Sequence, residues 1–468
     1  MASCQSSCIN LQTFFILVFS SISTFFLVSN HNNIVVAIAN SKPPPFTALY
    51  MPIKKDNSTL QYYTTIEWGS EENYFDVVID LGGEFLSLPC DSKNKSTTYR
   101  SINCGSTKCR LAKRSSSSST NTSTGSNCRA NDSTCTMSFH NPFNESVLSG
   151  RLSEDAFAAV PSDGDRISRD SYVNTSRLLP FLCLNSSRLK GLARGFMETN
   201  YGIPTGMIGF GATKMSFAQN LAPVFEVPSK FAICLPAAEA GQGVIFVGGG
   251  PYWFDPFWEN GTKDASKWLD YTPLFINPFG EYFIAVKSIK IDKRVVDFDT
   301  SLLSLNKKTG VGGTKISTST PYAVLRTSIY KAVVDDFVES AAARNITRVV
   351  AMGPFGTCFN TKNVRWSKAG PRVPVIDLEL EGSITATCSR VTWRINGANS
   401  MVRINKNVMC LGFIDGGSKA KTSIVIGGLQ LEDNLLEFDL KTSRLGFTSS
   451  FLPRDTSCST ERLLQPDD

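Results

Sequence analysis

The amino-acid sequence predicts a mainly β protein with two related β-lobes and a few short helices. Its 468 residues are enough for two or more domains. Short runs rich in β-branched and aromatic residues recur along the chain and end near Gly, Asp, Asn or Ser, a pattern typical of strands. These runs cover residues 62–68, 75–79, 243–247, 282–291, 423–426 and 435–447.

A weak internal repeat predicts that these strands form two lobes of similar design. In the first half of the chain, the run Val77–Gly83 is followed by the apolar-apolar-Gly run Met207–Gly211. In the second half, residues 313–319 are followed by a similar run at residues 424–428. Because both halves contain a strand, a polar turn and then an apolar-apolar-Gly run, we expect two related β-lobes.

One helix and one low-complexity insert are predicted within this pattern. Apolar residues recur with helical period between Ile329 and Ala341, and Thr327 or Ser328 is expected to cap the N-terminus of the helix. A Ser-rich insert near residues 113–126 has no apolar side chains to pack, so we expect an exposed loop there.

The N-terminus is typical of a signal peptide. Residues 11–28 form an uncharged, mostly apolar stretch, followed by the small-residue pattern Ala37-Ile38-Ala39 that signal peptidase recognises. A signal anchor is the alternative interpretation, and no later segment reaches the ~18 apolar residues of a membrane span. We therefore expect a signal peptide over residues 1–39 and a secreted mature chain with lobes at 40–270 and 271–468.

The cysteines and sequons agree with secretion. After loss of Cys4 and Cys8 with the signal peptide, 11 of the 13 cysteines remain, and their scattered positions favour disulfides over a zinc site. An odd number leaves at least one thiol unpaired or paired between molecules. Nine Asn-x-Ser/Thr sequons predict a glycosylated surface: Asn57, Asn94, Asn121, Asn131, Asn144, Asn174, Asn185, Asn260 and Asn345.

Composition excludes several classes of function. The net charge of +6 is a mild basic surplus without the Lys/Arg blocks of nucleic-acid-binding proteins. It favours an acidic partner, and acidic cell-wall polysaccharide is one candidate. Of the two histidines, His31 lies in the signal peptide, so His140 alone remains in the mature chain. This argues against His-dependent nucleophiles and catalytic zinc, and we expect neither a metal nor a cofactor.

Two segments resemble the active-site segments of pepsin-like aspartic proteases. The run Asp80-Leu81-Gly82-Gly83 resembles the first segment, which reads Asp-Thr-Gly-Ser before an apolar stretch. Residues 312–320 resemble the second segment, in which the family has Gly-Gly-Thr, two apolar residues and Asp-Ser/Thr-Gly-Thr. The resemblance implies a bilobal pepsin-like fold with β-barrel-like lobes. It places Asp80 at the first catalytic position and Ser317 at the second.

Ser317 removes the chemistry that the resemblance would otherwise imply. In the family, two neighbouring carboxylates share one proton, so that one acts as a base and the other as an acid. A serine hydroxyl performs neither role, and no neighbouring histidine is available to activate it. We therefore expect a catalytically inactive protein in which Asp80 and Ser317 are remnants of the dyad.

Other departures from the family pattern agree with this expectation. Leu81 stands where the family has a Thr that supports the dyad, Ser319 replaces a Gly, and Ser87 stands at a Trp position. The segment 142–146 lies where the family has a flap with a tyrosine, and it contains no tyrosine. Its sequon at Asn144 predicts a glycan that would obstruct the entry of a peptide.

Further stretches resemble a plant branch of this superfamily: residues 231–235, 282–289, 313–317 with Pro321-Tyr322, 343–348 and 423–428. On these the chain is identified as a member of the non-proteolytic branch of xylanase and xyloglucan-specific endoglucanase inhibitors, extracellular dermal glycoprotein and basic 7S globulin. The resemblance implies a secreted protein that inhibits a microbial cell-wall-degrading glycosidase in plant defence. A basic globulin-like storage or peptide-binding protein is the alternative, and an active aspartic endopeptidase is a third.

The resemblance also implies where the inhibitor would act. A glycosidase cleft holds two carboxylates about 5 to 9 Å apart, and a rigid cationic loop can enter it. In the family such loops come from the C-terminal lobe, and the matching loop here is 415–422, with Lys419 and Lys421. Lys421 stands where relatives have arginine, and lysine cannot bind a carboxylate bidentately. A second basic stretch could flank the interface or could simply be solvated: Lys362, Arg365, Lys368 and Arg372.

Disulfide pairs follow from the same resemblance. It implies bonds between Cys358 and Cys410 and between Cys234 and Cys458, and we expect a third between Cys90 and Cys183. Two local bridges would join Cys104, Cys109, Cys128 and Cys135, with a connectivity that the spacing leaves open. Cys388 then remains as the candidate for the odd thiol.

Overall fold

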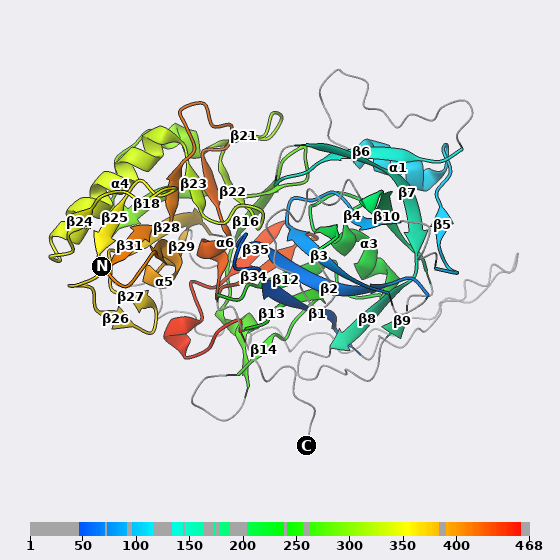
Figure 1. Cartoon of the computed structure of the whole chain (residues 1–468), viewed down its shortest axis with the longest axis horizontal. Coiled ribbons are helices and arrows are strands. Elements are labelled where there is room, and N and C mark those ends of the chain that lie inside the picture. Colours follow the sequence, from blue (N-terminus) through cyan, green and yellow to red (C-terminus); the bar gives the residue numbers. More distant parts are fainter. Residues whose placement is uncertain are drawn as a thin grey trace, which may run out of the picture.

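Strands dominate the protein, and they form two lobes that lie side by side (Figure 1). The computed structural model describes residues 46–70, 73–90, 96–115, 133–143, 146–162, 173–174, 177–186, 204–237, 241–255, 262–382 and 390–459. The predicted mainly β fold with a few short helices is confirmed. In this part of the chain, no helix combines the length and the apolar character needed to cross a membrane. The predicted signal peptide lies outside the described residues.

A central antiparallel sheet joins the two lobes. The N-terminal lobe contributes β1 (Ala48–Lys55), β13 (Gly243–Gly248) and β12 (Lys230–Cys234), and the C-terminal lobe contributes β34 (Leu435–Asp439), β35 (Arg444–Phe447) and β16 (Asp270–Ile276). They pair in that order, with β12 next to β34. The buried rings of Phe231 and Phe438 stack across this pair with centroids 4.7 Å apart. The junction between the lobes is therefore part of the hydrophobic core.

Within each lobe, one arrangement of three strands carries the internal repeat. In the N-terminal lobe, β11 (Gly206–Gly209) is parallel to β3 (Tyr74–Asp80) and antiparallel to β4 (Leu86–Pro89). In the C-terminal lobe, β33 (Ile424–Ile426) is parallel to β22 (Thr314–Ile316) and antiparallel to β23 (Ala323–Leu325). The two runs of each predicted repeat copy therefore lie on adjacent parallel strands.

The remaining strands complete the two lobes. Among the described residues, those of the N-terminal lobe are β2 (Tyr62–Trp68), β5 (Arg100–Ser101), β6 (Thr136–His140), β7 (Val147–Asp155), β8 (Phe157–Ser162), β9 (Val173–Asn174), β10 (Leu179–Leu184) and the short pair β14 (Trp253–Phe254) and β15 (Lys263–Asp264). The longer strands of the C-terminal lobe are β17 (Tyr282–Ile284), β18 (Val286–Ile291), β25 (Cys358–Asn360), β28 (Ile376–Glu381), β29 (Arg390–Ile395), β30 (Met401–Arg403), β31 (Val408–Leu411) and β32 (Phe413–Asp415). Short strand pairs, among them β24 (Arg348–Val349), β26 (Trp366–Ser367) and β27 (Gly370–Pro371), lie at the surface of this lobe.

Two of the expected strands are each two strands in the structure. The run 282–291 divides at Ala285 because β17 pairs with β16 and β22, whereas β18 pairs with β28 in a different sheet. The run 435–447 divides into β34 and β35, which form a hairpin whose turn places Ser443 at a φ of 52°. A continuous apolar pattern thus conceals a change of sheet in one case and a turn in the other.

The helices are few and short: α1 (Thr107–Ser115), α3 (Phe217–Val224), α4 (Thr327–Ala342), α5 (Gly397–Ser400) and α6 (Gly428–Leu431). The predicted helix is α4, and it buries Ile329, Val333 and Phe337. The expected cap at Thr327 or Ser328 was wrong, because both residues lie inside α4 and its N-cap is Arg326, which makes no side-chain capping bond. The first residues of the Ser-rich insert, 113–115, belong to α1 rather than to a loop, and its remainder lies outside the described residues.

Four disulfides are present among the described residues. The expected pairs Cys90–Cys183, Cys234–Cys458 and Cys358–Cys410 are all formed. The structure also settles one pair that the spacing left open, because Cys109 is bonded to Cys135. Cys104 is disulfide-bonded as well. Cys128 and Cys388 lie outside the described residues.

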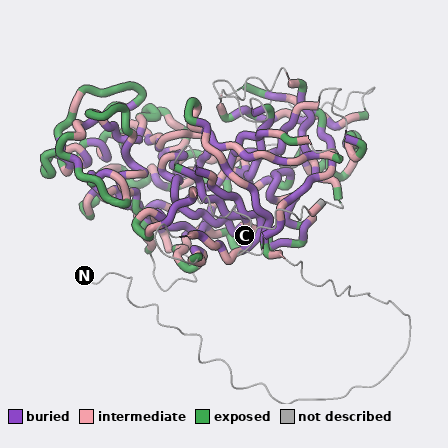
Figure 2. Tube along the Cα trace, turned by 60° about the horizontal axis from the view of Figure 1, so that its bottom comes forward, coloured by how far each residue is buried: buried purple, intermediate pink, exposed green. Residues whose placement is uncertain are grey.

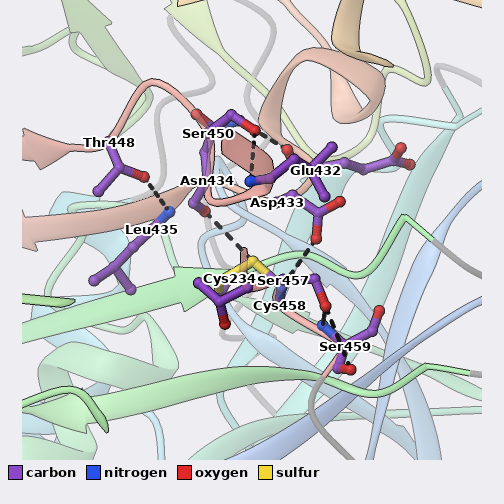
Figure 3. The surroundings of a disulfide bond; sticks show 12 residues. Cys234, Glu432, Asp433, Asn434, Leu435, Thr448, Ser450, Ser457, Cys458 and Ser459 are labelled. Atoms are coloured by element: carbon purple, nitrogen blue, oxygen red, sulfur yellow. Dashed lines mark hydrogen bonds between the residues drawn. A yellow bond between two sulfur atoms is a disulfide. The ribbon is translucent and has the colours of Figure 1, made fainter. Parts of the chain in front are cut away.

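The lobe junction buries two acidic side chains next to a disulfide (Figure 3). The backbone N–H of Cys458, which is bonded to Cys234 at the end of β12, donates to Oδ1 of Asp433 at 2.9 Å. The neighbouring Glu432 lies 2.6 Å from Nζ of Lys55 in the other lobe. Burial raises the pKa of Asp433 to about 6 and that of Glu432 to about 7. Both lobes therefore contribute to a buried polar network at the edge of the central sheet.

Candidate functional site

Asp80 is the last residue of β3 and is held by its own turn. Its Oδ1 accepts a hydrogen bond from the backbone N–H of Gly82 at 3.0 Å, and its carbonyl accepts from Gly83 at 3.1 Å and from Phe210 at 2.9 Å. A Cβ on Gly83 would lie 2.7 Å from Cα of Gly209, so the close approach of these two segments requires glycine. The Asp-Leu-Gly-Gly run therefore forms a tight turn that fixes one buried carboxyl group.

The environment of Asp80 favours the neutral form of its side chain. Burial raises its pKa to about 6, because the side chain is almost completely removed from water. The Gly82 N–H and the positive charge of Lys315 oppose this shift, while the charge of Glu281 adds to it. Lys315 and Glu281 form an ion pair at 2.9 Å between Nζ and Oε1.

Ser317 follows β22 at the equivalent position of the C-terminal lobe. Its backbone N–H donates to the carbonyl of Ile426 at 3.0 Å, and its Oγ lies 2.9 Å from Oγ of Ser319 and 3.3 Å from Oγ1 of Thr320. Among the hydrogen bonds of the described residues, none joins Ser317 to Asp80. The hydroxyl is thus engaged within its own segment.

Thr318 connects the two segments, and sequence reasoning did not single it out. Its buried hydroxyl accepts a hydrogen bond from the backbone N–H of Leu81 at 3.1 Å and donates to the carbonyl of Ile79 at 2.9 Å. Leu81 has no hydroxyl with which to make the reciprocal contact. Comparing the two repeat copies position by position could have indicated Thr318, because it follows Ser317 as Leu81 follows Asp80.

The expected flap is the hairpin of β6 and β7. The backbone N–H of Asn141 donates to the carbonyl of Ser146 at 2.8 Å and closes the turn. Phe143 packs against Val78, which lies on the same strand as Asp80. Asn144, with its expected glycan, lies outside the described residues. The hairpin thus places an aromatic ring, rather than a tyrosine hydroxyl, near the strand that carries Asp80.

The site therefore presents one buried carboxyl group, two serine hydroxyls and a bridging threonine where the resemblance calls for two carboxylates. Within the described residues, no group of three or more His, Cys, Asp or Glu side chains could hold a metal ion.

The loop 415–422 connects β32 to β33 and is anchored at both ends. Oδ1 of Asp415 accepts hydrogen bonds from the Thr327 hydroxyl at 2.6 Å and from the N–H of Gly417 at 2.9 Å. The carbonyl of Lys421 accepts from the N–H of Gly312 at 2.7 Å. Lys419 and Lys421 are exposed, and neither forms an ion pair with any described residue. The loop thus presents two free cations on a fixed base at the N-terminal end of α4.

The second basic stretch lies elsewhere. Arg365 and Arg372 line a groove beside Ala342, the last residue of α4, together with Lys362. Lys368 does not line this groove and forms an ion pair with Asp455. Because the 16 residues of α4 span about 24 Å, the groove and the loop 415–422 lie at opposite ends of the helix (Figure 1).

The expected glycosylation sites can be placed in part. Asn57, Asn185 and Asn345 are exposed, as an acceptor must be. Asn174 lies in β9. The other five lie outside the described residues: Asn94, Asn121, Asn131, Asn144 and Asn260.

Comparisons with known proteins agree with this description. The xylanase inhibitor N-terminal family model matches residues 62–249, and the xylanase inhibitor C-terminal model matches residues 281–449. The crystal structure of edgp is 42% identical, covers 89% of this chain and 98% of that chain, and superimposes with a TM-score of 0.77. Basic 7S globulin from soybean is 28% identical, with 90% and 99% of the chains covered and a TM-score of 0.71.

Two curated relatives extend the comparison. Probable aspartic proteinase GIP2 of Nicotiana benthamiana is 43% identical over 88% of this chain and 91% of its own length. Gamma conglutin 1 of Prunus dulcis is 36% identical over 95% of both chains. The fold and the site define a two-lobed, pepsin-like protein. Within that class, the chain belongs to the xylanase-inhibitor family.

Proposed function

We propose that this protein is a secreted, catalytically inactive pepsin-like protein that binds and blocks a microbial cell-wall-degrading glycosidase, such as a xyloglucan-specific endoglucanase or a xylanase. The observation that carries the proposal is the anchored loop 415–422, which presents Lys419 and Lys421 without ion-pair partners among the described residues.

The loop suits a cleft that holds two carboxylates. Its backbone is already fixed by Thr327 and Gly312, so binding would cost little additional ordering. An ammonium group that enters such a cleft forms charge-assisted hydrogen bonds in a site of low dielectric. The lysine ammonium is a point charge, whereas the arginine guanidinium can donate two parallel hydrogen bonds to one carboxylate. We therefore expect Lys421 to bind one carboxylate at a time.

The glycosidase test uses a panel of xyloglucanases and xylanases. We expect stoichiometric inhibition of at least one enzyme, and we expect Lys421→Ala to weaken it by about tenfold or more, with a larger loss at low salt. Lys441→Ala is the matched control, because Lys441 is an exposed lysine in the turn between β34 and β35. An untouched panel at micromolar protein, or equal losses in the two variants, would contradict the proposal.

We also propose that the protein has no peptidase activity. One carboxyl group of raised pKa and a serine engaged with Ser319 cannot divide the acid and base roles. An acid peptidase assay with pepstatin should show no inhibitor-sensitive cleavage. Pepstatin-sensitive activity that Asp80→Asn abolishes would establish a peptidase instead.

A storage or peptide-binding role is the second candidate. It is favoured by the similarity to basic 7S globulin and gamma conglutin, which covers nearly the whole chain. Such a protein should leave the glycosidase panel untouched and, for a peptide-binding role, should retain peptides in a pull-down from a random peptide library. The two candidates therefore predict opposite results in the glycosidase assay, and the pull-down tests the peptide-binding role.

A further inference from the structure

The groove at the C-terminal end of α4 is strongly basic. It has a volume of about 1170 Å³ and is formed by the end of α4, the following segment to Arg348, residues 362–365 and Arg372. Five cationic side chains line it, and its lining contains neither Asp nor Glu within the described part of the chain. These five are Arg344, Arg348, Lys362, Arg365 and Arg372.

Four of these five charges have no ion-pair partner among the described residues. Arg344 is paired with Asp292 at 2.6 Å. Arg348, Lys362, Arg365 and Arg372 form no ion pair with any residue in the described ranges, whereas the nearby Lys368 does so with Asp455. Four like charges around one groove repel one another, and this repulsion is relieved when an anion binds.

The backbone of the groove is preorganised. The side-chain amide of Asn363 donates to the carbonyl of Asn345 at 2.8 Å, and the N–H of Arg372 donates to the carbonyl of Arg365 at 2.8 Å. Ile346 and Val364 are buried beneath the surface and anchor the two sides. A ligand therefore meets a fixed array of charges and has little ordering cost to overcome.

The shape and the composition of the groove favour a polysaccharide over a protein. A protein interface needs an apolar centre, and here Ile346 and Val364 are buried and only Val338 offers a half-buried apolar side chain among the large apolar residues of the described lining. The cations are instead distributed along an open groove. This distribution suits a linear polymer that carries one carboxylate per sugar, since guanidinium groups match carboxylates geometrically. Figure 2 shows that exposed segments gather in this part of the C-terminal lobe, away from the N-terminal lobe.

We propose that this groove binds a linear polyuronate, a polysaccharide with regularly spaced carboxylates. It would do so independently of the proposed glycosidase inhibition, because the loop 415–422 lies at the opposite end of α4. The sequon residue Asn345 lines the same groove and is exposed. A glycan there would fill the space that the polymer needs, so the bare and glycosylated forms differ in binding.

The test measures the affinity of the mature protein for a polygalacturonate oligomer of about ten sugars, by calorimetry at low and at raised salt. The reference protein carries Thr347→Ala, which removes the sequon and keeps Asn345 in place. We expect measurable binding that weakens as salt rises. We expect no binding of the fully methyl-esterified oligomer, in which the carboxylates are neutral.

Two double variants remove the same amount of charge from different places. Arg365→Gln with Arg372→Gln should weaken polyuronate binding by about tenfold or more and leave glycosidase inhibition unchanged. Lys419→Gln with Lys421→Gln should leave polyuronate binding within about twofold and reduce glycosidase inhibition. Thermal melting of each variant checks that the fold is intact. If polyuronate binding fails while inhibition persists, the groove proposal alone falls, and the converse result removes only the inhibitor proposal.

Three outcomes would overturn the polyuronate assignment. Equal losses in the two double variants would show that net charge rather than the groove is responsible. Tighter binding of dextran sulfate than of polygalacturonate would assign the groove to sulfated polymers. Equal binding of poly-glutamate would indicate an acidic protein as the partner.

Discussion

The segments around Asp80 and Ser317 share one backbone arrangement and differ in their chemistry. Each follows a strand that is parallel to the strand of an apolar-apolar-Gly run. The first buries a titratable carboxyl group, and the second carries a hydroxyl bonded within its own segment. Thr318 of the second segment provides both hydrogen bonds that connect them, and they reach the backbone of the first segment at Leu81 and Ile79. The difference teaches that the strand framework of this fold does not depend on a pair of carboxylates.

The largest effect on stability is expected when the Ser317 segment is given a carboxyl group like that of the Asp80 segment. Ser317→Asp places another carboxyl group in a buried position, and the neighbouring cation Lys315 is already paired with Glu281. We expect a loss of about 3–5 kcal/mol in the free energy of unfolding at pH 7.5 and a much smaller loss at pH 4.5. Denaturant unfolding at both pH values measures it, with Ser317→Asn as the neutral control. Equal losses at the two pH values would show that shape, rather than charge, is the cause.

Removing the connection between the segments should have the next largest effect. Thr318→Val leaves the buried N–H of Leu81 and the carbonyl of Ile79 without their partner, which costs about 2–4 kcal/mol. The matched control is Thr314→Val, because the buried hydroxyl of Thr314 has no hydrogen-bond partner among the described residues. We expect that change to be neutral or slightly stabilising in the same unfolding assay. A comparable loss in both variants would contradict the bridging role of Thr318.

Removing the charge of the first segment should stabilise the protein, and only at higher pH. The pKa of Asp80 in the folded state, about 6, lies above its ordinary value, so the native state binds this proton more tightly than the unfolded chain does. The stability that the folded protein gains from this tighter proton binding is fully present below about pH 4 and is lost as pH rises through 6. Asp80→Asn should therefore gain about 2–3 kcal/mol at pH 7.5 and nothing at pH 4.

The slope of stability with pH distinguishes the ionisation of Asp80 from an effect of the substitution that is the same at every pH. Glu432 and Asp433 also have raised pKa values, so Asp80→Asn should flatten the profile in part. Melting temperatures measured from pH 4 to 8 provide the profile. An unchanged slope in the variant would mean that Asp80 is ionised at little cost in the native state.

The smallest effect is expected at Ser87 on β4. Its buried hydroxyl has no hydrogen-bond partner in the described part of the chain, so Ser87→Ala should stabilise the protein by about 0.5–1 kcal/mol. Ser153 on β7 is the control, because it is equally buried and lies 2.8 Å from the Tyr99 hydroxyl. Ser153→Ala should instead destabilise by about 1 kcal/mol. Shifts of the same sign would contradict this assignment.

What the sequence could predict was mostly local. The Asp80 and Ser317 segments are each one continuous run, so their positions and the mainly β fold followed from pattern and resemblance. Neither run shows by itself that Thr318 joins them, because its two partners lie more than 230 residues away, at Leu81 and Ile79, and only a position-by-position comparison of the repeat copies could have indicated it. The Cys109–Cys135 pair likewise depends on the packing of α1, which carries Cys109, against the residue before β6, and the spacing does not reveal this packing.

Surface geometry was also beyond the reach of the sequence. Lys368 and Arg372 are four residues apart, yet one lies against Asp455 and the other lines the groove at the end of α4. The separation of this groove from Lys421 by the length of a helix is a property of the folded chain. The proposed inhibitory loop and the proposed polyuronate groove are distinct surfaces because α4 lies between them in the folded protein.

The pairing of β12 with β34 also has a consequence for synthesis on the ribosome. The strands that the N-terminal lobe contributes to the central sheet, β1, β12 and β13, have been made by residue 248, but β12 receives its neighbour β34 at residues 435–439, and Cys234 its partner at residue 458. Until then the first lobe carries an unpaired strand edge that can associate with other chains. We expect a chain truncated before residue 434 to self-associate on size-exclusion chromatography. Completion of the last few dozen residues would then be the step that makes the nascent lobe safe from aggregation.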